Sequence, residues 1–213
     1  MHMTTSATRP GAKRGPYAKT ALRRAEIVEA ATSVFATRGY HGGSLRDIAR
    51  QIDLSLTSLV HHFSSKSELL EAVLENADRT ADWFGERAQQ QGLKVAIMEL
   101  VEINFSRAEL VRLLAIVSSE ASAPDHPAHR WFVARYDNVT ETLESMIVAD
   151  VAACRIRSVT NPRELACILT ATWDGLQLQW LLNPACDMRS QMSRALDTLL
   201  PTADPGTSHA DGI

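Results

Sequence analysis

The sequence predicts an all-α fold, and two observations support that prediction. Apolar residues recur along most of the 213-residue chain at the three- and four-residue spacings of amphipathic helices, and no segment of useful length alternates as a strand would. The periodic segments are also separated by Gly, Pro, Asn and Ser residues of the kinds that begin or end helices. We expect about nine helices, in a small N-terminal unit of three and a larger C-terminal unit.

The first helix is predicted over about residues 20–38. Gly39 is expected to end it, because glycine accepts the left-handed conformation at a helix C-terminus. Residues 1–19 are rich in Thr, Pro, Gly, Lys and Arg without an apolar period, which predicts a flexible basic arm. One apolar face of the predicted helix is formed by Ile27, Ala30, Ala31, Val34 and Phe35.

Two short helices follow and form a helix-turn-helix. Ser44-x-x-Asp47 is a capping box that begins the first of them, and Asp53 is expected to make the turn. Ser55 is the expected cap of the second helix, over 56–62, which Leu59 and Phe63 anchor in the core. The buried stripe of the first short helix contains Leu45, Ile48, Ala49 and Ile52.

The rest of the chain also has helical periods. Ser65-x-x-Glu68 is a second capping box, and it begins a helix that extends to about residue 90. Asn161-Pro162 is expected to begin a later helix, with Asn as the cap and Pro at the first helical position. We expect domains over 20–66 and 67–201, followed by a flexible tail over 202–213. Further helices are expected over about 93–105, 110–117, 132–147, 161–182 and 188–199.

Charge is divided unequally along the chain. The net charge of −3 conceals a segment, residues 1–66, with ten Lys and Arg against four Asp and Glu, a net +6. Residues 67–213 have twelve against twenty-one, a net −9. This asymmetry indicates that the N-terminal part faces a polyanion and that the acidic remainder does not.

Several classes of protein are disfavoured by the sequence. No stretch approaches the ~20 apolar residues of a membrane span, and no apolar signal core marks the N-terminus for export. Cys154, Cys167 and Cys186 are odd in number and lack C-x-x-C spacing, so we expect reduced thiols in a cytoplasmic protein. No nucleophile-base constellation or phosphate-binding glycine loop is present, so we expect neither catalysis nor a cofactor.

One sequence in the larger unit has the residue types of a metal site. Asp125-His126-x-x-His129 could supply ligands, but it lies beside proline at a loop and the start of a helix. We therefore interpret it as a solvated loop and expect no metal.

The helix-turn-helix suits DNA. The second helix of such a pair lies in the major groove, where its N-terminal residues meet base edges. The short or flat polar side chains there are Thr57, Ser58, His61 and His62. Arg46, on the preceding helix, could donate to guanine O6 and N7, and Lys66, at the start of the next helix, could hold a phosphate.

The same residues resemble a known family. Phe35-x-x-x-Gly39-Tyr40-x-x-x-Ser44-x-x-x-Ile48-Ala49, followed by Leu59-Val60-His61-His62-Phe63-x-x-Lys66-x-x-Leu69-Leu70, is similar to the TetR family of bacterial transcriptional regulators. The resemblance is specific over about residues 20–75. It implies an all-helical homodimeric repressor whose larger domain binds a small molecule that changes the separation of the two DNA-reading heads.

The family positions give an expected set of DNA contacts. Three residues depart from the pattern: Val60 replaces a phosphate-contacting Tyr, Asp53 replaces a turn Gly, and Thr57 replaces a frequent Gly. The basic arm is expected either to enter the minor groove or to be a solvated tail. Arg23 and Arg24 could reach phosphate or lie on a solvated face. The expected contacts are Ser44, Arg46, Ser55, Leu56, Thr57, Ser58, His61, His62 and Lys66, with Lys13, Arg14 and Lys19 from the arm.

The larger unit supplies expected ligand and dimer residues. The segment Asp174–Leu182 resembles the penultimate helix of the family, which helps to form the dimer. Aromatic residues here could line a pocket or simply form core, and a buried amide must find a partner. The expected ligand residues are Phe84, Asn104, Phe105, Trp131, Tyr136, Trp173 and Gln177, and the expected dimer residues are Trp173, Leu176, Trp180, Leu196 and Leu199.

Three other interpretations stay open on the sequence alone. The chain could be a DNA-binding dimer that senses no small molecule. It could be a ligand-binding or enzymatic helical domain whose DNA role is secondary. The three N-terminal helices could also be a packing element without a DNA role.

Overall fold

The computed structural model describes residues 16–78 and 81–203, and these residues confirm the all-α prediction. The described part contains ten helices and one isolated antiparallel bridge, between Ile156 and Thr202. The helices are α1 (Pro16–Gly42), α2 (Leu45–Gln51), α3 (Leu56–His62), α4 (Lys66–Asp78), α5 (Ala81–Gln91), α6 (Leu93–Phe105), α7 (Ala108–Glu120), α8 (His129–Ala152), α9 (Pro162–Leu182) and α10 (Met188–Leu199).

Side-chain caps begin the helices where the sequence predicts them. The Ser44 hydroxyl accepts a hydrogen bond from the Asp47 amide at 3.2 Å, and Ser55 accepts one from Ser58 at 3.1 Å. Ser65 accepts likewise from Glu68 at 3.1 Å. These oxygens bind N–H groups that have no partner inside the helix.

The first helix is longer than predicted, which corrects the expected basic arm. It begins at Pro16 and continues to Gly42, although Gly39 has non-helical angles of φ 69° and ψ 177°. Proline at the first helical position is already set at the helical φ, and this local propensity outweighs the basic composition of the segment. Lys19 therefore lies on a helix. Lys13 and Arg14 lie outside the described residues.

Two other boundaries also differ from the prediction. The helix expected over 65–90 is described as α4 and α5, with residues 79 and 80 outside the described residues. At the C-terminus, Thr202 bridges Ile156, and the Arg157 amide donates to the Pro201 carbonyl at 2.9 Å. These contacts hold the beginning of the expected flexible tail against the body of the protein.

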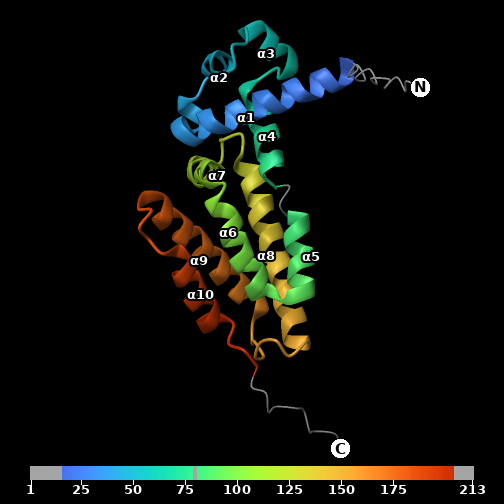
Figure 1. Ribbon diagram of the computed structural model, residues 1–213, viewed down its shortest axis with the longest axis vertical. Coiled ribbons are helices and arrows are strands. Elements are labelled where there is room, and N and C mark those ends of the chain that lie inside the picture. The colour runs from blue at the N-terminus through green and yellow to red at the C-terminus, as the bar shows by residue number, and fades with distance from the viewer. Residues whose placement is uncertain (1–15, 79–80, 204–213) are drawn as a thin grey trace, which may run out of the picture.

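Figure 1 shows α1, α2 and α3 together at one end of the molecule, which we call the head, with α7 directly beneath α1. The helices α5, α6, α8, α9 and α10 extend away from the head as a bundle. Two buried clusters hold this arrangement together. The first contains Ile27, Phe35, Ile48, Leu59, Phe63, Leu70, Leu74, Leu113 and Val117, and the second contains Leu93, Val101, Ile147, Leu169, Met188, Met192 and Leu196.

The first cluster joins the head to the rest of the chain. It includes Leu70 and Leu74 of α4 and Leu113 and Val117 of α7, so it continues past the expected boundary at residue 66. The division into two domains therefore remains a prediction. None of the described helices combines the length and apolar character that spanning a membrane requires.

Candidate functional site

The helices α2 and α3 form the predicted helix-turn-helix. The turn depends on Asp53, which has a positive φ of 50° as its replacement of glycine requires. The Leu54 amide closes the turn by donating to the Ala49 carbonyl at 2.9 Å. The Leu59 and Phe63 side chains have no exposed surface, so the inner side of α3 is fixed in the first core.

The opposite side of α3 is open to solvent. Thr57, Ser58, Val60 and His61 are exposed, while Leu56 and His62 are half-buried. The Ser58 hydroxyl accepts from the Ser55 hydroxyl at 2.9 Å. Thr57 and His61 have no such bond among the described contacts. An exposed polar row on a short helix is the surface that a major groove receives.

Arg46 is exposed on α2 beside this row. No ion pair or hydrogen bond engages its guanidinium within the described part of the chain. The neighbouring Asp47 pairs instead with Arg38 at 3.3 Å and Arg50 at 3.4 Å. The Ser44 hydroxyl, helped by Arg38 and Arg50, lowers the pKa of Asp47. Arg46 also contributes to a shallow groove of about 420 Å³ between α2 and α3.

Lys66 has a different place from the one predicted. Its Nζ donates to the Tyr40 carbonyl at 2.7 Å and the Gly43 carbonyl at 3.0 Å, and it lies 4.2 Å from the centre of the Tyr40 ring. Burial lowers the pKa of Lys66. Two of the three ammonium donors therefore hold the turn between α1 and α2. The expected phosphate contact of Lys66 stays a prediction.

Arg24 makes a contact that differs from both alternatives expected for it, a phosphate contact and a solvated face. Its guanidinium donates to the carbonyl of His62, the last residue of α3, and lies 4.0 Å from the centre of the Phe63 ring. A cation is favourable at a helix C-terminus, where carbonyls lack intrahelical partners. No local pattern indicates this contact, because 38 residues separate its partners. Arg23 pairs with Glu26 at 2.6 Å.

The two adjacent histidines of α3 lie at the edge of this surface, with ring centres 5.6 Å apart. Burial lowers the pKa of His62, and the nearby His61 and Arg24 lower it further. His62 is consequently neutral near neutral pH, so it can accept as well as donate hydrogen bonds.

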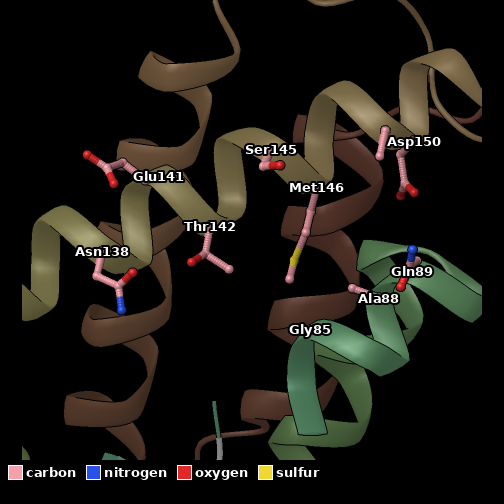
Figure 2. Close-up of a pocket in the computed structure, with 10 residues that line it drawn as sticks. Gly85, Ala88, Gln89, Asn138, Glu141, Thr142, Ser145, Met146 and Asp150 are labelled. Atoms are coloured by element: carbon pink, nitrogen blue, oxygen red, sulfur yellow. The ribbon is translucent and has the colours of Figure 1, made fainter. Parts of the chain in front are cut away.

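A second hollow lies in the bundle, between α5 and α8. It measures about 490 Å³ and is bordered by Gly85, Ala88 and Gln89 of α5 and by a longer run of α8. Figure 2 shows Thr142 and Met146 pointing from α8 to the same side as α5. Its other α8 residues are Asn138, Glu141, Ser145, Ala149 and Asp150.

None of the seven expected ligand residues borders this groove. The Asn104 amide, buried as expected, accepts from Arg107 at 3.0 Å, so its partner belongs to the chain. Tyr136 donates to Asp174 at 2.7 Å. The aromatic members of the set pack against other rings or the cores: Phe105 against Trp180, Trp131 against Phe132, and Phe84 and Trp173 against the second core. Gln177 is half-buried on α9.

The expected dimer residues are mostly turned inward. Leu196 is 1% exposed within the second core and cannot reach a partner, which corrects that prediction. Trp173, Leu176, Trp180 and Leu199 are partly buried against the same core. The face of α9 that remains outside instead carries a stripe of Ile168, Ala171, Gly175, Leu178 and Leu182. Their spacing of three and four residues was the signal in the sequence.

Comparison with known proteins agrees with this geometry. Residues 27–73 match the family model described as bacterial regulatory proteins, tetR family. The HTH-type transcriptional repressor KstR2 of Mycolicibacterium smegmatis is 40% identical over 70 residues, which are a third of each chain. The HTH-type transcriptional regulator PksA of Bacillus subtilis is 26% identical over 82% of this chain and 86% of its own.

A solved structure extends the likeness to the bundle. A putative transcriptional regulator from Saccharomonospora viridis, in complex with choline, has a TM-score of 0.71 over 84% of this chain and 98% of its own, at 23% identity. The chain is thus all-α, has an exposed helix-turn-helix, and shares its overall fold with this structure. Over residues 27–73 the chain is therefore similar to the TetR family of bacterial regulators.

Lys66 and Arg46 should respond differently to substitution. We expect Lys66→Ala to lower the free energy of unfolding by about 1–3 kcal/mol, because it leaves the Tyr40 and Gly43 carbonyls without their charged donor. Arg46→Ala, which removes an exposed side chain, should change it by less than about 0.5 kcal/mol. Urea unfolding followed by circular dichroism measures both, and equal losses would contradict these separate roles.

Proposed function

We propose that this regulator is a homodimeric repressor that reads a pseudo-palindromic operator with α2 and α3 and is released from it by a small molecule. The observation that carries the proposal is the exposed Arg46 guanidinium beside the exposed row of α3, which has no ion pair or hydrogen bond with the residues that the structure describes. Two recognition helices about 34–36 Å apart fit successive major grooves on one side of a duplex.

Each exposed group of the head has a role in this proposal. Arg46 donates to guanine, while Thr57 and His61 approach base edges or phosphates. Ser44, Ser55 and Ser58 orient the helices, because their hydroxyls are engaged in caps or in each other. His62 and Leu56 lie at the margins of the contact. Lys19 extends along α1 and is exposed, so it is an additional phosphate contact.

The first test is DNA binding. We expect Arg46→Ala to weaken binding to the intergenic DNA beside the gene by about 5- to 150-fold, since a good bidentate contact contributes roughly 1–3 kcal/mol of discrimination. Fluorescence anisotropy at fixed salt measures the loss. Arg194→Ala is the matched control, because it removes the same charge from an exposed position on α10, at a distance from the head. Equal losses in both variants would contradict a contact at Arg46.

The proposed dimer uses the outer stripe of α9. Leu178 is 51% exposed and Leu182 78%, which is unusual for leucines on a well-packed helix. Gly175 has no neighbouring atom within 4 Å of the position that a Cβ would take, so a second helix can approach its backbone closely. Pairing α9 with its copy would bury the stripe and bring two heads to one face of the dimer.

The dimer is tested at the centre of this stripe. Leu178→Glu should shift the protein from dimer to monomer at micromolar concentration, because two carboxylates would meet in a dry contact. Sedimentation velocity measures the change. Val148→Glu, the same change at an exposed residue of α8, should leave the dimer intact. A dimer that survives the Leu178 substitution would place the interface elsewhere.

The proposed effector site is the groove between α5 and α8. Its volume of about 490 Å³ lies within the range of small-molecule sites. Amide, hydroxyl and carboxylate groups of Gln89, Thr142 and Glu141 are combined there with the apolar Met146 and Ala88. The proposed effector is therefore a small molecule with several hydrogen-bonding groups and a short apolar part. The solved relative with choline gives a precedent for a small ligand in this fold.

Filling the groove tests this site. A thermal-shift screen of small polar metabolites, including choline, should find a compound that stabilises the protein by about 2.7 kcal/mol at a hundredfold excess over its Kd. Thr142→Trp should abolish that stabilisation, while Val148→Trp, outside the groove, should preserve it. Stabilisation that persists in Thr142→Trp would exclude the groove, and a screen without hits would favour a regulator that senses no small molecule.

A further inference from the structure

One carboxylate outside the head binds the backbone of the head directly. Glu120, at the end of α7, accepts from the Tyr40 amide at 2.7 Å and from the His41 amide at 3.4 Å. These are the two amides that follow the non-helical Gly39. A Cβ atom at residue 39 would overlap the Glu120 carboxylate, so the contact depends on glycine.

A buried histidine packs against the same point. His126, in the segment between α7 and α8, is only 5% exposed, and its ring centre lies 5.0 Å from that of Tyr40 and 5.4 Å from that of His41. Its Nδ1 accepts from the Ala128 amide at 3.1 Å. Its Nε2 is buried and has no hydrogen-bond partner among the described residues. An acceptor on Nδ1 and a buried ring favour the neutral imidazole.

Ionisable groups surround this ring from every element that meets there. Lys66 of α4 lies over the Tyr40 ring, and Glu120 of α7 is the carboxylate that acts most strongly to raise the pKa of His126. His129 of α8 is held separately, because its Nδ1 is 2.8 Å from the Ala121 carbonyl. The charged or titratable groups that face His126 are His41, Lys66, Glu120 and Asp125.

We propose that Glu120 and His126 form a proton-sensitive latch, which holds the head on α7 while His126 is neutral and loosens when His126 takes up a proton. The latch itself does not depend on the proposed function. Only the change in DNA affinity that we expect from it rests on that function. Glu120 and His126 are positioning residues, since neither is offered to DNA.

The latch would loosen because a second proton on His126 changes its hydrogen bonds and the charges around it. Because Nδ1 of the neutral ring accepts, the ring already carries its proton on the buried Nε2. A second proton would go to Nδ1, so the bond from the Ala128 amide would be lost and two N–H donors would face each other there. It would also add a positive charge close to Lys66. Attraction to Glu120 would draw that carboxylate away from the Tyr40 amide. Each effect separates α1 from α7.

The direction of the pH dependence follows from the same burial. Burial lowers the pKa of His126 below its ordinary value of 6.5. Glu120 acts against this shift, and His41 adds to it. Above pH 6.5 the folded and unfolded chains are both neutral at this residue, and its full contribution to stability is present. As pH falls below 6.5, the unfolded chain binds the proton first, and stability is lost.

The test compares the wild-type protein with His126→Asn. Asparagine keeps an oxygen that can accept from the Ala128 amide but cannot be protonated. Between about pH 8 and pH 5.5 the unfolding equilibrium constant of the wild type should rise more steeply than that of the variant, by up to tenfold per pH unit. The ratio of wild-type to variant affinity for the intergenic duplex should fall about five- to tenfold over the same interval.

Ratios between variants are needed because other groups on the head, His62 among them, also change charge at low pH, and they do so in both proteins. His41→Asn is the matched control, since it removes an exposed histidine beside the same ring and should retain the pH dependence. His126→Phe keeps the ring packing if asparagine fails to fold. Equal pH slopes for the wild type and His126→Asn, or for Phe if Asn is unfolded, would overturn the latch. Loss of DNA binding by all variants at every pH, with the unfolding difference intact, would overturn the proposed function and leave the latch.

Discussion

The contact of Glu120 with the backbone after Gly39 is the constraint on which the arrangement of the head depends. A helix that continued without interruption would have no free amides at Tyr40 and His41, because each would donate within the helix. The left-handed glycine releases those two amides, and a carboxylate from a residue 80 positions later receives them. Gly39 thus both interrupts the helix and leaves the amides that Glu120 binds. The helices α2 and α3 follow this point in the chain, and their inner sides are buried in the first cluster.

The basic side chains near the helix-turn-helix differ in whether they bind backbone carbonyls or lie exposed to solvent. Lys66 and Arg24 are used inside the head, one on the turn after α1 and the other on the end of α3, where each satisfies carbonyls that a helix leaves open. Arg46 has no such bond among the described residues, and it is the side chain that we propose for DNA. The positive charge of the N-terminal segment is therefore only partly an attraction for phosphate. The rest stabilises the surface that makes the contact.

Local features of the fold could be predicted from the sequence, and features that join distant residues could not. The caps at Ser44, Ser55 and Asn161 and the positive φ of Asp53 follow from residue type within four positions. The role of Lys66 depends on carbonyls more than twenty residues away, and no sequence pattern marks a backbone acceptor. Among the expected dimer residues, Leu196 was wrong for a related reason, while the other four stay a prediction. Helical spacing reveals an apolar face, but it does not tell whether the chain buries that face itself.

The small size of α3 has a consequence for how such a regulator changes its target. In seven residues, the groups that hold the helix are Leu59, the Ser55 cap and the last carbonyl bound by Arg24, and none of them is the exposed side chain of Thr57, Val60 or His61. The reading face can therefore be replaced residue by residue while the framework beneath it is unchanged. A duplicated copy of the gene could therefore come to recognise a new operator through a few exposed substitutions, because such substitutions change the free energy of unfolding little.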